Sequence, residues 1–343
     1  MIFGYKFMQS QKQRNSNLEL YRIILMLLII AHHYVINSGL VEHFNPASDM
    51  FHYAYYSIFG MWGKTAINGF VMITGYYMCQ AKITKYKFIK MLLEVEFYNL
   101  TINLLFMLTG LYQYTFADFL FSLVPGGIDI AHGFVVCFLI FYLCIPLLNK
   151  VLHKCTCKQH LCLIIGALFL YYLIEWLYSG HVYTGYLTWF PIIYLISSYL
   201  RKIKLGGSVT LWGGINIGCI LIAIALTIFM PTGRDMPFYY VRECNTPLAL
   251  LIGVSSFMFF KNLKMSYHRY INIVGASTFG VLLIHANCKN MRHWLWYDLL
   301  DVKDTYEVNI IYPVIIVIAI FVLCILIDYL RKRYIEEIIL ERF

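Results

Sequence analysis

A chain of 343 residues has enough length for two soluble domains, but 60% of its residues are hydrophobic, 13% are charged and its mean hydropathy is +0.67. These values lie far from the average of soluble globular proteins. Composition therefore argues against a soluble enzyme and predicts a polytopic membrane protein. The formal net charge of +9 then indicates orientation and attraction to anionic lipid, and not nucleic-acid binding.

Apolar stretches long enough to cross a bilayer recur along the whole chain. A membrane helix needs about 17 to 25 apolar residues, which predicts an all-α integral membrane protein with about ten transmembrane helices. We expect a single membrane domain over residues 1–343, with 1–18 as a cytoplasmic N-terminal segment and 330–343 as a cytoplasmic tail. The expected spans are 19–38, 59–80, 88–110, 132–150, 160–178, 185–200, 208–230, 246–260, 271–286 and 308–329.

Basic residues in the connecting segments predict the orientation of these spans. With the N-terminus inside, 21 Lys and Arg residues fall on the cytoplasmic side and six on the outer side, as the positive-inside rule requires. The six outer ones are Lys64, Arg234, Arg242, Lys289, Arg292 and Lys303. We therefore expect both termini to be cytoplasmic, and we expect the first span to be retained because no small-residue cleavage site follows it.

The first span carries an ionisable stripe. Arg22 and His33 are eleven positions apart, which is three turns plus about 20° and a rise of roughly 16 Å, so both lie on one face with Glu19 close to it. Singly, Arg22 is typical of an interfacial anchor paired with Glu19, and His33 of an interhelical hydrogen bond. Their shared stripe favours function. His32 points about 100° away and is expected to be a packing or hydrogen-bonding neighbour.

Other polar residues fall within or beside the spans. His285 closes the ninth span and shares its face with Thr278, where packing is the alternative to function. Gly69 and Gly75 flank Thr74 in the second span, which predicts close packing or a kink. Asp328, in the tenth span, is expected at the membrane interface.

The first inner loop has two interpretations. It carries a run of lysines, which fits either plain positive-inside character or a phosphate-rich cytoplasmic ligand. The lysines are Lys82, Lys85, Lys87 and Lys90.

Three further features are weaker signals. The His/Cys segment 153–162 has C-x-C spacing, not the spacing usual for zinc, so we do not expect a metal there. Cys244 and Cys288 both fall in outer loops, where pairing stays open. The segment 115–131 is broken by Pro, Gly and Asp and is expected to lie at the outer surface or to re-enter between helices.

Several stretches together resemble the membrane-bound acyltransferase family 3. Its first-helix pattern, Arg-x₁₀-His preceded by an acid, is similar to Arg22, His33 and Glu19. The segments "GKTAINGFVMITGYYM", "HGFVVCFLIFYLCIPLLNKVL", "TWFPIIYLISSYLRKI" and "INIVGASTFGVLLIHANCKNMRHWLW" resemble later helices of the family in the expected order. The closest resemblance is to the bacterial subgroup that O-acetylates exopolysaccharides and other cell-surface glycans.

The chain departs from the family pattern at a few positions. Lys87 and Lys90 stand where the family often has arginines, and lysine lacks the bidentate fork that suits phosphate. Leu282 replaces a tyrosine before His285, His132-Gly133 replaces an aromatic pair, and Ser198 replaces a glycine.

The resemblance implies an O-acyltransferase of the bacterial cytoplasmic membrane. The donor would be cytoplasmic acyl-CoA, most simply acetyl-CoA, and the acceptor a hydroxyl of a surface or lipid-linked glycan. No permanently bound cofactor, metal or nucleic-acid partner is expected, and membrane lipid surrounds the protein.

The resemblance also implies residue roles. His33 would act as general base or acyl relay, because a hydroxyl is a weak nucleophile at neutral pH, with His285 as second candidate. Arg22 and the four loop lysines would meet the CoA phosphates. Contacts to the acceptor or thioester would come from Asn68, Thr74, Arg292 and His132.

Two other classes of function fit parts of the sequence. A transporter or flippase would line a substrate path with the same charges and make no bond, although no repeat symmetry is visible between the halves. A receptor or scaffold would explain the aromatic residues but would give no role to Arg22 and His33 on one face.

Overall fold

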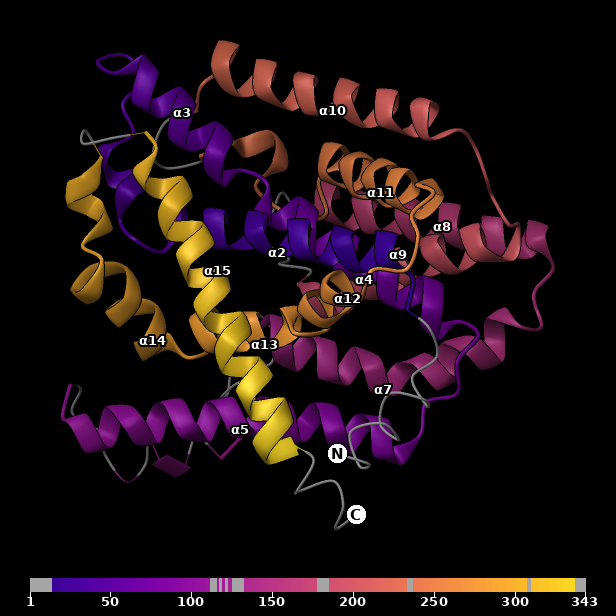
Figure 1. Cartoon of the computed structure of the whole chain (residues 1–343). Coiled ribbons are helices and arrows are strands. Elements are labelled where there is room, and N and C mark those ends of the chain that lie inside the picture. The colour runs from indigo at the N-terminus through magenta and orange to yellow at the C-terminus, as the bar shows by residue number, and fades with distance from the viewer. Residues whose placement is uncertain are drawn as a thin grey trace.

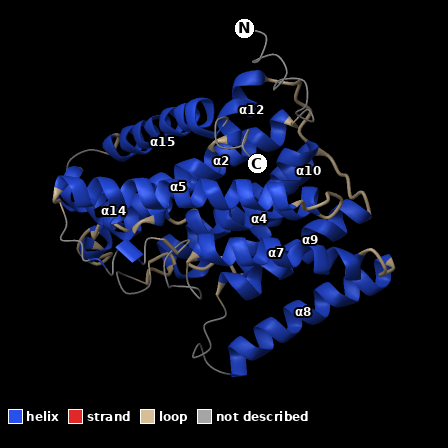
Figure 2. Ribbon diagram, turned by 90° about the horizontal axis from the view of Figure 1, so that it is seen from below, coloured by secondary structure: helices blue, strands red, loops and turns tan. Residues whose placement is uncertain are grey.

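The computed structural model describes residues 14–111, 116, 119–120, 123–124, 133–177, 185–232, 237–306 and 310–336. Within these ranges the fold consists of helices and turns without strands (Figures 1 and 2). The segment 115–131, expected to lie on the surface or re-enter, and His132 fall almost wholly outside the described residues.

Helices occupy most of each of the ten ranges expected from hydropathy. They are α2 (Ser16–Ile36), α4 (Gly63–Met78), α5 (Lys85–Thr109), α7 (Phe134–Leu152), α8 (Cys157–Leu177), α9 (Tyr186–Lys202), α10 (Val209–Phe229), α11 (Pro247–Asn262), the continuous run of α12 (Arg269–Ala276), α13 (Thr278–Leu282) and η3 (Leu283–Asn287), and α15 (Tyr312–Arg331). Shorter elements are η1 (Leu40–His43), α3 (Met50–Gly60), η2 (Tyr239–Val241), α14 (Lys289–His293), η4 (Trp294–Leu299), η5 (Val302–Thr305) and η6 (Lys332–Glu336).

Seven of the described helices are long and apolar enough to cross a membrane, which supports a multi-pass membrane protein. The other three expected spans, α4, α9 and α11, are 16, 17 and 16 residues long. A helix of 17 residues rises only about 26 Å, less than the hydrocarbon thickness of a typical bilayer. The count of about ten spans therefore stays a prediction.

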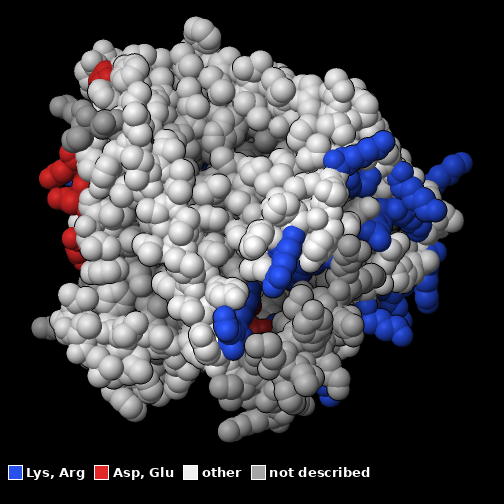
Figure 3. All heavy atoms as spheres, viewed as in Figure 1, with Lys and Arg blue, Asp and Glu red and all other residues white. Residues whose placement is uncertain are grey.

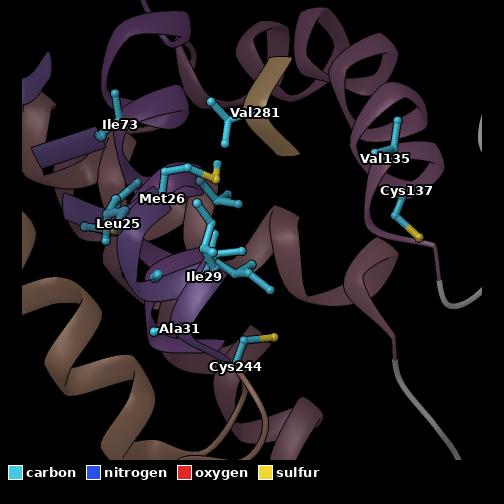
Figure 4. Packing of buried hydrophobic residues seen from close by; sticks show 14 of the residues in the cluster. Leu25, Met26, Ile29, Ala31, Ile73, Val135, Cys137, Cys244 and Val281 are labelled. Carbon is cyan, nitrogen blue, oxygen red and sulfur yellow. The ribbon is translucent and has the colours of Figure 1, made fainter. Parts of the chain in front are cut away.

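The helix α2 lies at the centre of the fold and α8 and α10 at its periphery (Figures 1 and 2). In its most apolar window 56% of α2 is buried, and the run Arg269–Asn287 reaches 61%, whereas α10 and α8 reach only 11% and 17%. Leu25, Met26 and Ile29 project from α2 into the hydrophobic core (Figure 4). The helix with the ionisable stripe is thus one of the two most buried of these seven helices, and the lipid-facing surface is left to outer helices such as α8 and α10.

Two glycines let α4 approach α2 closely. A Cβ atom on Gly63 would lie 2.3 Å from the His32 Cβ, and one on Gly69 would lie 2.5 Å from the Tyr21 hydroxyl oxygen. These contacts confirm the close packing predicted for the second span. They also show that α2 and α4 are antiparallel, because the start of α4 meets the end of α2.

The two ends of the helix bundle differ in charge. At the end where α2 begins and α4, α9 and α11 finish, here called the basic end, the Asn17 side-chain amide donates to the Phe260 carbonyl and Arg201 donates to Gln80. At the opposite end, acids pair with basic residues, as in Lys64–Glu243 and Lys303–Glu42. Figure 3 shows Lys and Arg gathered at the right and lower right, and Asp and Glu at the left edge.

A buried ion cluster connects α15 to α5 at the basic end. Asp328 is fully buried, and its carboxylate lies 3.0 Å from Arg331 Nη2 and 2.8 Å from Lys332 Nζ. Arg331 Nη2 also lies 2.9 Å from the Glu94 carboxylate, and the Tyr98 hydroxyl donates to Asp328 Oδ1. Asp328 was expected at the interface. At this end of the bundle it is also covered by protein, because α5 and α13 pack on this side of α15.

Candidate active site

The predicted stripe of α2 borders a large cavity. Arg22 and His33 both line it, and Met26 and Ile29 line it on the turns between them. Glu19 is outside the lining: it is buried against Gly275 of α12 and lies 3.1 Å from Arg14 Nη1 and 4.0 Å from Arg22 Nε. Glu19 therefore accepts a hydrogen bond from Arg14, lies near Arg22 without a hydrogen bond to it, and does not line the cavity.

A pair of histidines closes the deep part of the stripe. His33 Nδ1 lies 3.0 Å from His285 Nε2, although the two residues are 252 positions apart. His285 Nδ1 lies 2.6 Å from the Val281 carbonyl oxygen. His285 belongs to η3, a π-helical turn, and such turns occur frequently at functional sites. The structure thus brings together the two intramembrane histidines that the sequence singled out.

These two contacts decide where the protons of the neutral pair lie. A carbonyl oxygen only accepts, so the proton of His285 is on Nδ1, and its Nε2 has a lone pair. His33 Nδ1 must then donate to that lone pair, which leaves the lone pair on His33 Nε2. His33 lines the cavity. This is the arrangement of an imidazole base held in one tautomer by a second group.

His32 has a different environment. Its Nδ1 lies 2.8 Å from the Gly60 carbonyl oxygen, and its side chain packs against Gly63. It also contributes to the cavity lining. Its Nδ1 therefore donates to the backbone, which leaves a lone pair on Nε2 in the neutral ring.

One cavity of about 1290 Å³ reaches both ends of the bundle. This volume exceeds the usual range for sites of small ligands, about 300 to 1,000 Å³. Its lining passes from Arg14, Arg22, Tyr77 and Glu94 at the basic end, through His33, Thr74, Asn99 and Thr278, to Lys64, Arg242, Glu243, Lys289 and Arg292 at the opposite end. Two substrates that arrive from opposite ends would meet near His33.

Thr74 and Asn68, both expected to contact thioester or sugar, differ in position. Thr74 lines the cavity, and its hydroxyl donates to the Phe70 carbonyl of its own helix. Asn68 is fully buried outside the lining: its amide donates to the Cys244 and Ala249 carbonyls and accepts from the Trp189 indole N–H. All these bonds are internal, so Asn68 connects α4 to α9 and α11 and cannot contact a substrate in this arrangement.

The four loop lysines do not line the cavity. Lys82, Lys85 and Lys87 are exposed around the first turn of α5, and Lys90 pairs with Glu336. Met91, which follows Lys90, does line it. The lysines therefore lie outside the lining, and among the described residues Arg14 and Arg22 are the cations that line the cavity at the basic end.

Arg292 lines the cavity at the opposite end, close to the histidine pair. Its guanidinium donates to the Ala286 carbonyl, next to His285. Burial lowers the pKa of Arg292 from its ordinary value, but an arginine remains charged in proteins.

One free thiol lines this cavity within the described ranges, that of Cys288, which donates to the Asn103 side-chain oxygen. Cys244 and Cys288 are both free, so the pairing left open by the sequence is not made. Burial raises the pKa of the Cys244 thiol to about 12, which keeps it protonated. The described residues hold no group of three metal-ligating side chains, and both His153 and His160 bind backbone carbonyls.

Two asparagines of α5 line the cavity although the sequence patterns above did not single them out. Asn99 and Asn103 both line the cavity, and the Asn103 amide donates to the Asn99 carbonyl. Their spacing of four puts them on one face of an apolar helix, and polar groups in such helices are functional candidates. That signal was present in "YNLTIN".

Comparison with known proteins gives a family but no individual relative. The model of acyltransferase family 3, described as "Acyltransferase domain", matches residues 15–329, from the start of α2 almost to the end of α15. Searches of curated proteins and of solved structures found no match.

Proposed function

Because this chain belongs to acyltransferase family 3, we propose that it moves an acyl group, most simply acetyl, from cytoplasmic acyl-CoA to a hydroxyl of a surface or lipid-linked glycan. One observation carries the proposal: a single cavity reaches both ends of the helix bundle, and His33 lies on its wall between two cationic mouths. The family model describes acyltransferases, which favours transfer of an acyl group over transport of a solute.

The charge of the two ends supports the proposed orientation. Basic residues collect on the cytoplasmic side of membrane proteins, so the basic end would face the cytoplasm, in the membrane of a bacterial cell. Both termini would then be cytoplasmic, and acyl-CoA would reach the mouth bordered by Arg14 and Arg22.

The donor end suits the phosphates of CoA. Arginine binds phosphate through a planar fork of donors, and Arg22 Nε lies 4.0 Å from the Glu19 carboxylate, too far for a hydrogen bond to fix it there. The exposed lysines on the first turn of α5 add a positive field that draws an anionic donor toward the mouth. The acyl thioester would extend from these cations along Met26 and Ile29 toward His33.

In the proposed reaction, His33 Nε2 takes the proton of the acceptor hydroxyl. The hydroxyl oxygen bonds to the thioester carbonyl carbon, the carbon–sulfur bond breaks, and the proton passes from His33 to the departing CoA thiolate. His285 acts as a positioning residue, because its Nε2 lone pair holds His33 in the productive tautomer and accepts from the imidazolium. In an acyl-histidine relay the same His33 nitrogen would carry the acyl group between the two substrates.

Replacement of His33 tests the assignment. We expect His33→Ala to abolish glycan acetylation, a loss of at least about 100-fold, while the protein still inserts into the membrane. The measurement is transfer of label from acetyl-CoA to glycan by purified protein. His268→Ala, an exposed histidine outside the cavity lining, is the matched control and should retain full activity.

Retained transfer in His33→Ala would sink the catalytic role. The two routes are separated by rapid quenching of the wild-type protein with labelled acetyl-CoA and no acceptor. Label bound to the protein in the wild type and absent in His33→Ala supports the relay, and absence of label in both supports direct attack.

A further inference from the structure

His32 has a hydrogen-bonding atom at the cavity that the proposed reaction does not use. Its Nδ1 donates to the Gly60 carbonyl, so the neutral ring has a lone pair on Nε2. No described residue hydrogen-bonds to this nitrogen, and its surface is not sealed by protein. Because His32 lines the cavity and only 7% of its surface is exposed, the open side of Nε2 faces the cavity.

The backbone around His32 fixes its ring at the end of the bundle opposite the basic end. Gly60 ends α3 and Gly63 begins α4, and a Cβ atom on Gly63 would lie 2.4 Å from the His32 Cγ. A side chain at position 63 would therefore displace the ring. Together with the bond to Gly60, this contact holds Nε2 in one place, on the side from which the acceptor would arrive.

Phe238 lies beside the His32 ring and also lines the cavity. The two ring centroids are 6.0 Å apart, and Phe238 is almost completely buried. Its φ of 45° lies in the left-handed region, which bulky residues rarely adopt, and such conformations cluster at ligand sites. An aromatic face suits the apolar C–H surface of a sugar ring, whose hydroxyls then bond to polar neighbours.

His32 and His33 present lone pairs to the same cavity from adjacent positions. Their ring centroids are 5.9 Å apart, and each Nδ1 is already used, by Gly60 and by His285. Both rings therefore accept through Nε2. With a hydrogen bond of about 2.8 Å on each side, two hydroxyls on adjacent carbons of one sugar can bond to one ring each. A lone hydroxyl would leave the second nitrogen without a donor.

We propose that His32 Nε2 and the Phe238 ring form an acceptor subsite, in which His32 accepts a hydrogen bond from one hydroxyl while the neighbouring hydroxyl gives its proton to His33. The acceptor unit is then a sugar with two free hydroxyls on adjacent carbons, one of which receives the acyl group. This inference rests on the proposed function and adds the chemical class of the acceptor. The hydroxyl on His32 is unchanged in the reaction, so the subsite contributes binding and orientation.

The first experiment uses periodate, which cleaves the carbon–carbon bond between two free neighbouring hydroxyls and is reduced to iodate. Surface glycan is isolated from host cells with the wild-type gene and from cells with His33→Ala, and periodate consumption at neutral pH is compared with acetyl content. We expect the wild-type glycan to consume less periodate for every acetyl group that it carries, because acetylation of either hydroxyl protects the diol. Equal consumption by glycans that differ in acetyl content overturns this inference alone, whereas equal acetyl content in both strains overturns the proposed function and this inference with it.

The second experiment separates the two nitrogens of His32. His32→Asn keeps an amide donor for the Gly60 carbonyl but has no acceptor at the position of Nε2, whereas His32→Gln places an amide oxygen near that position and gives up the bond to Gly60. Unacetylated glycan from the His33→Ala strain serves as acceptor for the full-length protein, and initial rates give KM for glycan and for acetyl-CoA. We expect His32→Asn to raise the glycan KM about tenfold, or about 1.4 kcal/mol, as loss of one hydrogen bond implies. His32→Gln should raise it less, and neither variant should change the acetyl-CoA KM.

The matched control is His160→Gln, at a second buried histidine, which bonds to the Leu195 carbonyl through Nε2 and lies outside the cavity lining. It should leave both constants unchanged. An unchanged acetyl-CoA KM in the His32 variants shows that they are folded. If the glycan KM of His32→Gln then equals or exceeds that of His32→Asn, His32 does not bind the acceptor through Nε2 and the inference fails.

Discussion

The helix bundle contains two buried polar groups, the Asp328–Arg331–Glu94 cluster and the His33–His285 pair. They differ in whether a hydrogen-bonding atom is left without a partner in the protein. In the Asp328–Arg331–Glu94 cluster, charge meets charge: Asp328 has Arg331 and Lys332 beside it, and Arg331 also contacts Glu94. In the His33–His285 pair, a chain of hydrogen bonds from the Val281 carbonyl ends at a ring nitrogen of His33 with a lone pair. The first arrangement compensates its charges, and the second leaves one ring nitrogen of His33 with a lone pair.

This difference distinguishes polar groups that stabilise an apolar helix bundle from polar groups that can take part in a reaction. Burial alone does not separate them, because Asp328 and His285 are both almost completely buried. The difference is that His33 has a ring nitrogen with a lone pair and lines the cavity, whereas Asp328 is compensated by neighbouring cations and lies outside the lining. We therefore expect variants of the cluster to change stability and variants of the pair to change rate.

The largest effect is expected from a substitution that breaks the Asp328–Arg331–Glu94 cluster. Asp328→Ala leaves Arg331 with a reduced set of partners in a buried site, and loss of one member of a buried pair costs about 3–5 kcal/mol. We expect the free energy of unfolding in detergent to fall by about that amount, measured by denaturant titration. The exposed pair His293–Asp298 offers the control, because Asp298→Ala should cost at most about 1 kcal/mol. Unchanged stability with lost transfer in Asp328→Ala would instead place the cluster in the chemistry.

A smaller effect is expected for the second member of the pair. His285→Ala removes the acceptor of His33 Nδ1, so we expect kcat to fall about 100-fold, or about 2.7 kcal/mol, with little change in either KM. His285→Gln supplies a carbonyl oxygen as acceptor and should recover part of kcat. Equal kcat in the Ala and Gln variants would argue against a role through the His33 tautomer, and transfer of labelled acetyl measures both.

The smallest of the three effects is expected at the donor end, for Arg22. Arg22→Lys keeps the charge but removes the bidentate fork, so we expect the KM for acyl-CoA to rise about tenfold, or about 1.4 kcal/mol, with kcat nearly unchanged. Arg269→Lys, at the same end but outside the lining, is the matched control. A fall in kcat without a change in KM would move Arg22 from donor binding to the reaction itself.

Much of the helical framework and part of the site are predictable from residue patterns. Hydropathy located each of the ten helical stretches, and the helical period placed Arg22 and His33 on one wall of the cavity. The period could not tell that Glu19 turns away into a contact with Gly275. Nor could it tell that Asn68 is used internally, since an asparagine in an apolar helix fits either a substrate contact or a helix-to-helix bond.

By itself, the sequence determined the membrane class, the helices and the stripe of α2, because each depends on residues within about 20 positions of one another. Only the tertiary structure decided that His285 meets His33, that Asp328 is buried and that four outer cations reach one cavity mouth. The physical reason is packing: close approach of α4 at Gly63 and Gly69 to α2, and of α12 at Gly275, sets which helix faces meet. The periodicity of residues along the chain describes one helix at a time and does not indicate which helix packs against it.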